Sequence, residues 1–523
     1  MERIAVVLRW RKTLAIAAGA LAATGFQPLA LWPVTLAAVA LLIHLVSSAP
    51  DWKRALLLGW LFGVGHFTLG NNWIATAFTY QAEMPAWLGW IAVFLLSLYL
   101  AVYPALAALG GWLVARLRPE GLVPAFAGCW IVSEWLRSWV FTGFAWNPLG
   151  MVTLGGFSRP GLASLAPWTG TYALSGLVAL AAGAWLHAVL RARQRRWLAA
   201  GILGLVPVAA FLMPLGGSGG QGTLPFTLVQ PDTRQEDLND AAKFEDQFQV
   251  TAALTRAQKP GERRLVLWPE SGIPDYLREG YPQLYYDSST YAGNPVLARS
   301  RIARVIGKGS LLLTGAVDLE IRNGRAVSAD NTVSAVDENG RLLRGYAKAH
   351  LVPYGEYLPL KGLLEPLGLT RLVAGTIEFR PGPGPRTIDY GPWGRIGFQI
   401  CYEIIFSGQV VDPQQRPAMI FNPSNDGWFG AWGPPQHLAQ ARMRAIEEGL
   451  PVLRATTTGI SAVIDADGVV RQFLPLKARG RIDGLVPPAH APTLFSQAGN
   501  LLALAWAAVL LALSMVVRRR ARG

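Results

Sequence analysis

The feature that most constrains this chain is a series of long apolar stretches, each close to the ~20 residues that a helix needs to cross a bilayer. About seven of them lie in the first 215 residues, and one more closes the chain. Because lipid offers the backbone no hydrogen-bond partners, such stretches are expected to be helical. We predict spans near residues 12–28, 30–48, 55–77, 88–115, 121–140, 168–190, 197–215 and 497–517.

The composition agrees with a membrane protein. Hydrophobic residues make up 52% of the 523 residues and charged residues only 15%, whereas ordinary soluble domains carry about 25% charged residues. So little charge cannot cover the surface of a soluble protein of this length. The net charge of +14 invites a nucleic-acid interpretation, but much of the excess lies in short clusters beside the apolar stretches. We therefore expect an integral membrane protein that does not bind nucleic acid.

These basic clusters also indicate the orientation of the spans, because lysine and arginine gather on the cytoplasmic side. With the N-terminus in the cytoplasm and the side alternating at each span, every cluster falls on the cytoplasmic side. Both termini are then cytoplasmic, and the polar segment after the seventh span is exported. The clusters are Arg9, Arg11 and Lys12; Lys53 and Arg54; Arg116 and Arg118; Arg191, Arg193, Arg195 and Arg196; and Arg518 to Arg520 with Arg522.

The chain accordingly divides into three parts. Residues 1–216 are expected to form a transmembrane bundle of about seven helices, residues 217–494 an exported domain, and residues 495–523 a transmembrane helix with a basic tail. In the exported part, strand-like runs alternate with helical segments, which is typical of an α/β layered domain. We expect strands at 264–268, 310–317, 395–400, 418–422 and 452–463, a hairpin of 331–337 with 341–348, and a helix at 436–449.

Three of these expected strands each lead into a side chain capable of chemistry: Glu270, Lys348 and Cys401. Loops at strand ends are where α/β folds collect catalytic groups. A carboxylate can remove the proton of a thiol, and an ammonium group can stabilise the thiolate and then the oxyanion of an attacked carbonyl. Spacing alone leaves open whether these three residues act together.

The two cysteines differ in their surroundings. Cys129 lies in an apolar span, where a lone cysteine is most simply a small buried hydrophobe. Cys401 is the only cysteine of the exported part. An unpaired cysteine on that side of a membrane is a candidate reactive thiol, because exported domains normally pair their cysteines.

Several motifs carry a resemblance to a known family. The surroundings of Glu270, Lys348 and Cys401 resemble the Glu-Lys-Cys triad of the nitrilase, or carbon–nitrogen hydrolase, superfamily. Longer motifs are similar to its membrane-bound branch, the apolipoprotein N-acyltransferases, in that family's order and over nearly the whole chain. They are Glu134-Trp-Leu-Arg with Thr142-Gly-Phe-Ala-Trp-Asn, Trp268-Pro-Glu-Ser-Gly, Lys348-Ala-His-Leu-Val-Pro-Tyr-Gly-Glu-Tyr, Cys401-Tyr-Glu, Asn422-Pro-Ser-Asn-Asp-Gly-Trp-Phe-Gly, and Gln436-His437 with Ala441-Arg-Met-Arg-Ala-Ile-Glu.

This resemblance implies a fold, a location and a reaction. The exported part would be a nitrilase-like α-β-β-α sandwich on the periplasmic side of a bacterial inner membrane. Enzymes of this family move an acyl chain from a phospholipid, usually from its sn-1 position, onto the cysteine as a thioester. The chain then passes to the amine of the S-diacylglyceryl cysteine that begins an apolipoprotein, which completes lipoprotein maturation. No cofactor is implied, and we expect a monomer.

The resemblance also assigns roles to residues. It makes Glu270 the general base, Cys401 the nucleophile and Lys348 the electrostatic stabiliser of the tetrahedral oxyanion, with the backbone N–H of Tyr402 as a second oxyanion donor. Supporting positions of the family correspond to Glu356, Tyr402 and Glu403. Of these, Glu356 is expected to orient Lys348 or the incoming amine.

Two other functions stay open on the sequence. One is a membrane-anchored nitrilase-type amidase that uses water as the acceptor, although a hydrolase would not need several spans to present an acyl groove. The other is a transporter or scaffold with a degenerate exported domain, which the intact triad argues against.

Some polar residues can be interpreted either as structural or as functional. Glu134 and Arg137 lie three residues apart in a predicted helix, and we favour a structural ion pair over contact with a lipid headgroup. A metal is not expected at His350 or His437, because no ligand cluster accompanies them. The apolar segment from Leu358 to Leu372 is broken by prolines and glycines and suits an arm that lies on the membrane surface.

Overall fold

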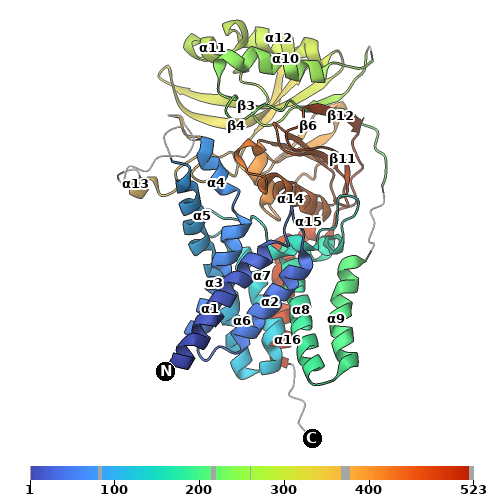
Figure 1. The fold of residues 1–523 in the computed structure, drawn as a ribbon. Helices are drawn as coiled ribbons and strands as arrows, with labels where there is room; N and C mark the ends of the chain where they lie inside the picture. Colours follow the sequence, from blue (N-terminus) through green and yellow to red (C-terminus); the bar gives the residue numbers. More distant parts are fainter. Residues whose placement is uncertain are drawn as a thin grey trace.

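The computed structural model describes residues 2–80, 85–213, 219–259, 261–364, 366 and 377–516. It has a helical bundle at one end and a domain of two stacked sheets at the other (Figure 1). Part of the predicted membrane arm, at 365 and 367–372, lies outside the described residues, as does the basic tail from 517 onwards.

The helical part contains a helix in each of the eight segments predicted to be spans. Within the described ranges, Trp87–Leu117 and Leu162–Arg193 are long and apolar enough to cross a membrane, and three of the other helices are apolar but shorter. The helices are α1 (Glu2–Ala23), α2 (Trp32–Ser47), α3 (Trp52–Gly70), α4 (Ile74–Ala77), α5 (Trp87–Leu100), α6 (Val102–Leu117), α7 (Leu122–Arg137), α8 (Ala166–Arg193), α9 (Trp197–Leu212) and α16 (Asn500–Val516).

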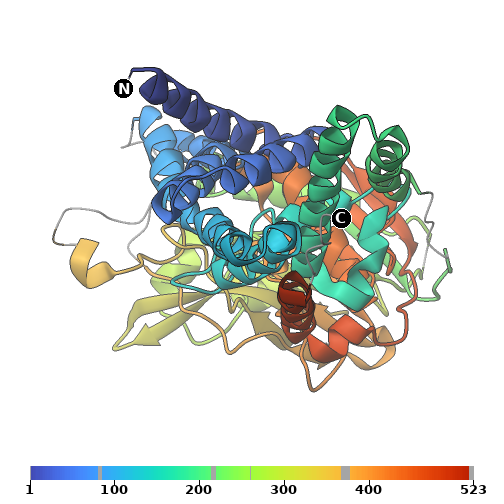
Figure 2. The same cartoon turned by 90° about the horizontal axis from the view of Figure 1, so that it is seen from below.

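The helices of the bundle approach one another closely. A Cβ atom added at Gly59 of α3 would lie 2.5 Å from Ala108 Cβ of α6, and one added at Gly63 would lie 2.6 Å from Ala101 Cα. Small residues at such contacts let helix backbones pack tightly. The last described helix, α16, packs against α7 and α8, so the first and last described helices both belong to the bundle (Figure 2).

The predicted ion pair between Glu134 and Arg137 is wrong. Among the described residues no ion pair joins them, because the loop after α7 folds back and supplies partners from its own backbone. Glu134 Oε1 accepts from the N–H of Leu149 at 2.7 Å. Arg137 Nη1 donates to the carbonyl oxygens of Phe144 and Trp146 at 2.8 Å each. The two charged side chains therefore fix this loop at the end of the bundle.

Two six-stranded sheets form the second part. Their orders are β12-β1-β2-β3-β4-β5 and β11-β10-β9-β8-β7-β6 in the described residues. The strands are β1 (Pro225–Gln230), β2 (Leu265–Leu267), β3 (Leu311–Arg322), β4 (Arg325–Asp337), β5 (Leu342–Ala347), β6 (Thr387–Asp389), β7 (Arg395–Phe398), β8 (Met419–Ser424), β9 (Val452–Thr456), β10 (Ser461–Ile464), β11 (Val470–Leu474) and β12 (Gly480–Leu485).

Helices cover the outer faces of both sheets, which gives the expected α-β-β-α layers. Between the sheets lies an apolar core that includes Leu267 from one sheet and Phe421 from the other. Helices α10 (Phe244–Thr255) and α12 (Pro295–Ile306) pack on the outer face of the first sheet, and α11 (Gln283–Ser289) lies beside them (Figure 1). Helix α14 (Gly433–Glu448) packs on the outer face of the second sheet.

Most of the predicted strands of this domain are present. The hairpin is confirmed, since β4 and β5 pair antiparallel. The run at 452–463 proves to be two strands, β9 and β10, which pair antiparallel across a turn. The turn between them begins with Thr457-Thr458-Gly459, a polar break that the predicted single run passed over. The sequence pattern did not predict strands β1, β6, β11 and β12.

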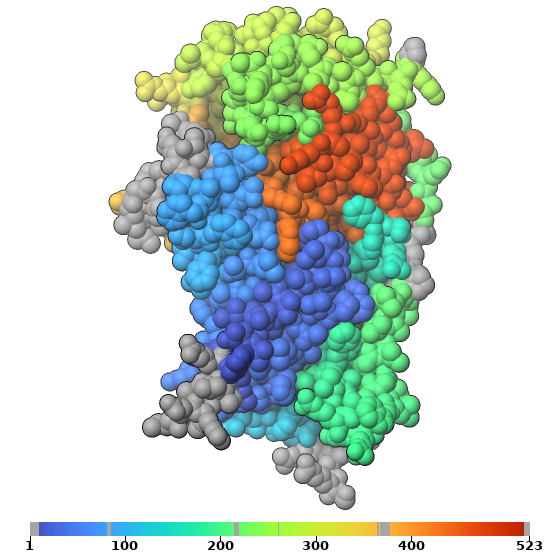
Figure 3. Space-filling view, in the orientation of Figure 1, coloured from blue at the N-terminus to red at the C-terminus, as the bar shows by residue number. Residues whose placement is uncertain are grey.

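Helix α14 joins the two parts of the molecule. It is buried along nearly its whole length, because one side meets the second sheet and the other meets the bundle. Polar bonds cross this junction: Trp146 Nε1 donates to Gln436 Oε1 at 2.8 Å, and Thr171 N donates to Glu447 Oε1 at 2.7 Å. The sandwich domain therefore sits directly on the end of the bundle (Figure 3).

Candidate active site

The structure brings Glu270, Lys348 and Cys401 together between the two sheets. Glu270 lies in the loop after β2, Lys348 directly follows β5, and Cys401 begins the 3-10 turn Cys401–Ile405 after β7. All three are buried. Lys348 Nζ lies 3.4 Å from Glu270 Oε1. The backbone of Asn425 joins the third residue to them, since its N–H donates to Glu270 Oε2 at 2.8 Å and its carbonyl oxygen lies 3.9 Å from Cys401 Sγ.

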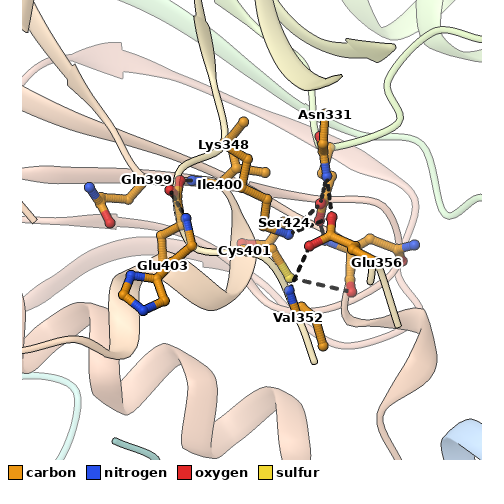
Figure 4. A network of polar contacts seen from close by, with 12 residues as sticks. Asn331, Lys348, Val352, Glu356, Gln399, Ile400, Cys401, Glu403 and Ser424 are labelled. Carbon is orange, nitrogen blue, oxygen red and sulfur yellow. Dashed lines mark hydrogen bonds and ion pairs between the residues drawn. The ribbon is translucent and has the colours of Figure 1, made fainter. Parts of the chain in front are cut away.

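A second carboxylate completes a network around Lys348 (Figure 4). Lys348 Nζ donates to Glu356 Oε1 at 3.0 Å. Asn331 Nδ2 donates both to Glu356 Oε1 at 2.9 Å and to Glu270 Oε1 at 2.8 Å. The remaining oxygen of Glu356 accepts from the N–H of Val352 at 2.7 Å. The ammonium group is thus fixed between two carboxylates, each of which is held by one backbone N–H and by the Asn331 amide.

The charges of this network decide the protonation of Lys348. Burial alone would lower the pKa of Lys348, but the carboxylates of Glu356 and Glu270 outweigh it and raise that pKa above its ordinary value. The side chain is therefore a fixed ammonium group, as an oxyanion stabiliser requires.

The Cys401 thiol keeps its proton in this resting arrangement. Burial raises the pKa of Cys401 well above its ordinary value, the charge of Glu270 raises it further, and Lys348 acts in the opposite direction. Because a thiol is a weaker nucleophile than its thiolate, attack from this site needs a base at the moment of reaction.

Glu403 connects the loop that carries Lys348 to the strand that carries Cys401. Its Oε1 accepts from the N–H groups of Ala349 at 2.7 Å and His350 at 3.1 Å and from Tyr346 Oη at 2.8 Å. Its Oε2 accepts from the N–H of Ile400 at 2.7 Å. Burial raises the pKa of Glu403 to about 7, although these hydrogen bonds lower it. The side chain fixes the backbone on either side of the reactive groups.

The side chain and the backbone N–H of Tyr402 have different surroundings. Its side chain points towards the bundle, where the hydroxyl donates to the carbonyl oxygen of Gly143 at 3.3 Å. Its backbone N–H has no hydrogen-bond acceptor among the residues that the structure describes. A buried N–H without a partner next to a nucleophile is suited to bind a negatively charged oxygen.

Sequence reasoning missed several residues of the site. Asn331 lies inside a predicted strand and Asn425 inside a quoted motif, but nothing in their spacing marks them as neighbours of Glu270. Asp426, His437 and Arg454 form a further buried polar cluster next to Cys401. The available signal was Arg454, a charged residue inside an otherwise apolar predicted strand. In the described ranges, no group of three or more His, Cys, Asp or Glu side chains could hold a metal ion.

Two family profiles match the chain. The profile of the "Apolipoprotein N-acyltransferase N-terminal domain" matches residues 18–184, and that of "Carbon-nitrogen hydrolase" matches residues 227–489. The first match lies within the helical bundle, and the second spans nearly all of the sandwich domain. Among solved structures, the chain is similar to an amidase from Nesterenkonia sp., with 18% sequence identity, a TM-score of 0.33, and coverage of 52% of this chain and 93% of that one.

Relatives of known name match over almost the whole length. Apolipoprotein N-acyltransferase of Rhodopseudomonas palustris is 34% identical, over 99% of this chain and 97% of its own. That of Caulobacter vibrioides is 35% identical, over 97% of this chain and 94% of its own. The expected family is therefore confirmed. With both domains present and aligned from end to end, this chain belongs to the apolipoprotein N-acyltransferase family of acyltransferases.

Proposed function

We propose that this acyltransferase takes an acyl chain from the sn-1 position of a phospholipid, holds it as a thioester on Cys401, and transfers it to the N-terminal amine of a diacylated apolipoprotein. The observation that carries the proposal is the buried Cys401 thiol beside one carboxylate and one fixed ammonium group. The family name supports the apolipoprotein acceptor, while the donor and the thioester are our inference from this site.

In the first half-reaction Glu270 removes the proton from Cys401 as the sulfur attacks the ester carbonyl. The oxyanion that forms is stabilised by Lys348 Nζ and by the N–H of Tyr402. The bond between the carbonyl carbon and the glycerol oxygen then breaks, and Glu270 returns its proton to the departing lysophospholipid. The thioester remains on Cys401. Glu356 and Glu403 serve as positioning residues, because one holds Lys348 and the other holds the backbone around it.

In the second half-reaction the apolipoprotein amine attacks the thioester. Glu270 takes a proton from the amine nitrogen, and the same two donors stabilise the second oxyanion. The bond between carbon and sulfur breaks, and the thiolate regains a proton from Glu270. One carboxylate thus carries the proton in both halves. This role fits Glu270, which accepts from the N–H of Asn425, whose carbonyl oxygen faces the Cys401 thiol.

Placement in a membrane explains why a nitrilase-like domain sits on a helical bundle. Both substrates carry acyl chains, and extracting one from a bilayer would cost ~0.8 kcal/mol per CH₂ group. The bundle exposes large apolar side chains, among them Leu95, Leu113 and Leu205, as a lipid-facing surface does. We assign residues 1–216 and 495–523 to the inner membrane and residues 217–494 to the periplasm, and the working unit is a monomer.

A pocket at the junction suits an acyl chain. It has a volume of about 500 Å³ and opens where α4 and α5 meet the loop after β8. Ala75, Trp87 and Trp90 line it from the bundle, and Gly430 and Trp432 line it from the catalytic domain. The same loop begins near Asn425, which contacts the triad. We therefore place the acyl chain of the donor here, with its ester towards Cys401.

The decisive experiment follows acyl mass on Cys401. Purified protein mixed with phosphatidylethanolamine vesicles, labelled in the sn-1 or the sn-2 chain, should gain the sn-1 mass on Cys401, and neutral hydroxylamine should remove it. A peptide that begins with S-diacylglyceryl cysteine should then accept the label, whereas the same peptide with an acetylated amine should not. Release of free fatty acid without any transfer would indicate a hydrolase instead, and a label on another residue would exclude the thioester.

Topology gives an independent prediction. A reporter fused after Gly523 should be active only in the cytoplasm, and one inserted near Gly217 should be active only in the periplasm, because the basic clusters hold their loops inside. Paired reporters that respond in opposite compartments distinguish the two sites. Two reporters on the same side would contradict the eight-span arrangement.

A further inference from the structure

Cys401 has a backbone that an ordinary residue rarely adopts. Its φ angle is +50°, in the left-handed region that favours glycine. Such a conformation at a reactive residue persists only when the surrounding structure holds it in place. It also places the nucleophile on a sharp turn between strand β7 and the 3-10 turn that follows, as in other enzymes where a nucleophile sits on a strained strand end.

Two side chains hold this turn, one on either side of Cys401. Before it, the N–H of Ile400 donates to Glu403 Oε2 at 2.7 Å. After it, the carbonyl oxygen of Cys401 accepts from His437 Nε2 at 3.0 Å. That carbonyl belongs to the same peptide plane as the N–H of Tyr402. Since the two groups of a trans peptide point in opposite directions, a donor that fixes the carbonyl also fixes the direction of the N–H.

His437 is itself fixed within a buried polar cluster. Arg454 Nη2 lies 3.0 Å from His437 Nδ1 and contacts both carboxylate oxygens of Asp426, at 2.8 and 2.7 Å. Asp426 Oδ1 lies 2.9 Å from the same ring nitrogen. The imidazole also packs against Trp146 of the bundle, with ring centroids 5.3 Å apart.

These contacts determine which nitrogen carries the hydrogen. The carbonyl oxygen of Cys401 can only accept, so Nε2 must donate. Burial and the charge of Arg454 lower the pKa of His437, whereas the Asp426 carboxylate raises it. At the other nitrogen, Nδ1, Asp426 Oδ1 favours a hydrogen on the ring and Arg454 Nη2 opposes one, and in either case Nε2 remains the donor to Cys401.

We propose that His437 is a positioning residue for acyl transfer: by donating to the carbonyl oxygen of Cys401, it aims the N–H of Tyr402 at the point where the oxyanion forms. Asp426 and Arg454 orient the ring, and Trp146 brings the bundle into contact with it. The inference rests on the proposed function, because it needs an oxyanion at this site. It does not depend on which ester supplies the acyl chain.

The test compares His437→Gln with His437→Met in the full-length protein. The two side chains have similar size, but only glutamine can donate to the Cys401 carbonyl and accept from Arg454. The probe is p-nitrophenyl butyrate, whose burst of p-nitrophenolate reports acylation of Cys401 without any phospholipid. We expect the methionine variant to lose about 10²-fold in the saturating burst rate, as for a misplaced catalytic group. The concentration of p-nitrophenyl butyrate that half-saturates this variant should stay within about twofold of the wild-type value. The glutamine variant should have a burst rate about tenfold higher than that of the methionine variant.

A second variant tests the proposal in case the methionine variant does not fold. A Cβ atom at Gly459 would lie 2.4 Å from Asp426 Oδ2, so Gly459→Ala displaces the carboxylate that orients the cluster while His437 stays unchanged. It should lower the burst rate in the same sense. The proposal would be overturned if the two His437 variants had equal burst rates at equal thermal stability. If the methionine variant does not fold, a wild-type burst rate in Gly459→Ala would overturn it. If the wild-type protein gives a normal burst but phospholipid vesicles do not acylate it, the proposed acyl donor is wrong. If the wild-type protein gains no acyl mass at Cys401 from either reagent, both the proposed function and this inference are overturned.

Discussion

Replacing Cys401 by serine should lower the rate of acyl transfer by roughly 10⁴-fold or more, since loss of the nucleophile from a catalytic triad has effects of this size or larger. The physical reason is the hydroxyl group, which is far harder to ionise than a thiol. In this site the difficulty is compounded, because burial and the charge of Glu270 already oppose ionisation of the thiol itself. The measurement is acyl mass on residue 401 with time after mixing with phosphatidylethanolamine vesicles.

The matched control is the same substitution at the other cysteine. Cys129 lies in helix α7 and is also unpaired in the structure. Cys129→Ser should keep the wild-type rate and the wild-type acyl mass on Cys401. A serine variant at 401 that transfers acyl chains at more than a few per cent of the normal rate would mean that no thioester lies on the pathway.

The meeting of Glu270, Lys348 and Cys401 was predictable because each lies shortly after the end of a strand. Strand ends are marked by short apolar runs, and β-sheets align those ends in space. Lys348 and Cys401 could therefore be placed from local sequence alone. Their chemical roles came from the resemblance of the surrounding motifs, since spacing does not distinguish a catalytic lysine from an incidental one.

The rest of the site depends on contacts that no local pattern records. Asn331 lies in mid-strand, and its amide matters only because β4 passes between two carboxylates. His437 lies on α14, and its contact with Cys401 requires the helix to pack on the outer face of the second sheet. The predicted ion pair of Glu134 with Arg137 is absent for a related reason. The loop that supplies hydrogen-bond partners to both side chains follows the helix in sequence but folds back onto it.

Replacing Glu270 by glutamine should lower the rate of Cys401 acylation by roughly 10²–10⁴-fold, the usual effect of losing a general base. Glutamine keeps the size of the side chain but cannot accept the thiol proton. It also introduces a local clash. Both oxygens of Glu270 accept hydrogen bonds, one from the N–H of Asn425 and the other from Asn331 and Lys348. An amide NH₂ group must therefore face a donor on one side.

The site offers a control for that clash. Glu356 shares two of these partners, since one of its oxygens faces Asn331 and Lys348, and its other oxygen faces a backbone N–H, that of Val352. Glu356→Gln thus creates the same donor-to-donor contact and removes the same charge next to Lys348, but it leaves the proposed base in place. We expect it to acylate Cys401 more slowly than wild type and at least tenfold faster than Glu270→Gln, the excess being the contribution of the base.

The measurement is the single-turnover rate of acyl-Cys401 formation in both variants, with folding checked by thermal melts in the same detergent. If the two glutamine variants are equally impaired, the charge around Lys348 accounts for the loss, and Glu270 has no separate role as proton carrier. If folded Glu270→Gln acylates at the wild-type rate, the base must be sought elsewhere. The backbone of Asn425 links Glu270 to the sulfur of Cys401, because its N–H donates to Glu270 Oε2 and its carbonyl oxygen faces the thiol. This link is the reason to expect that Glu270→Gln is the slower of the two variants.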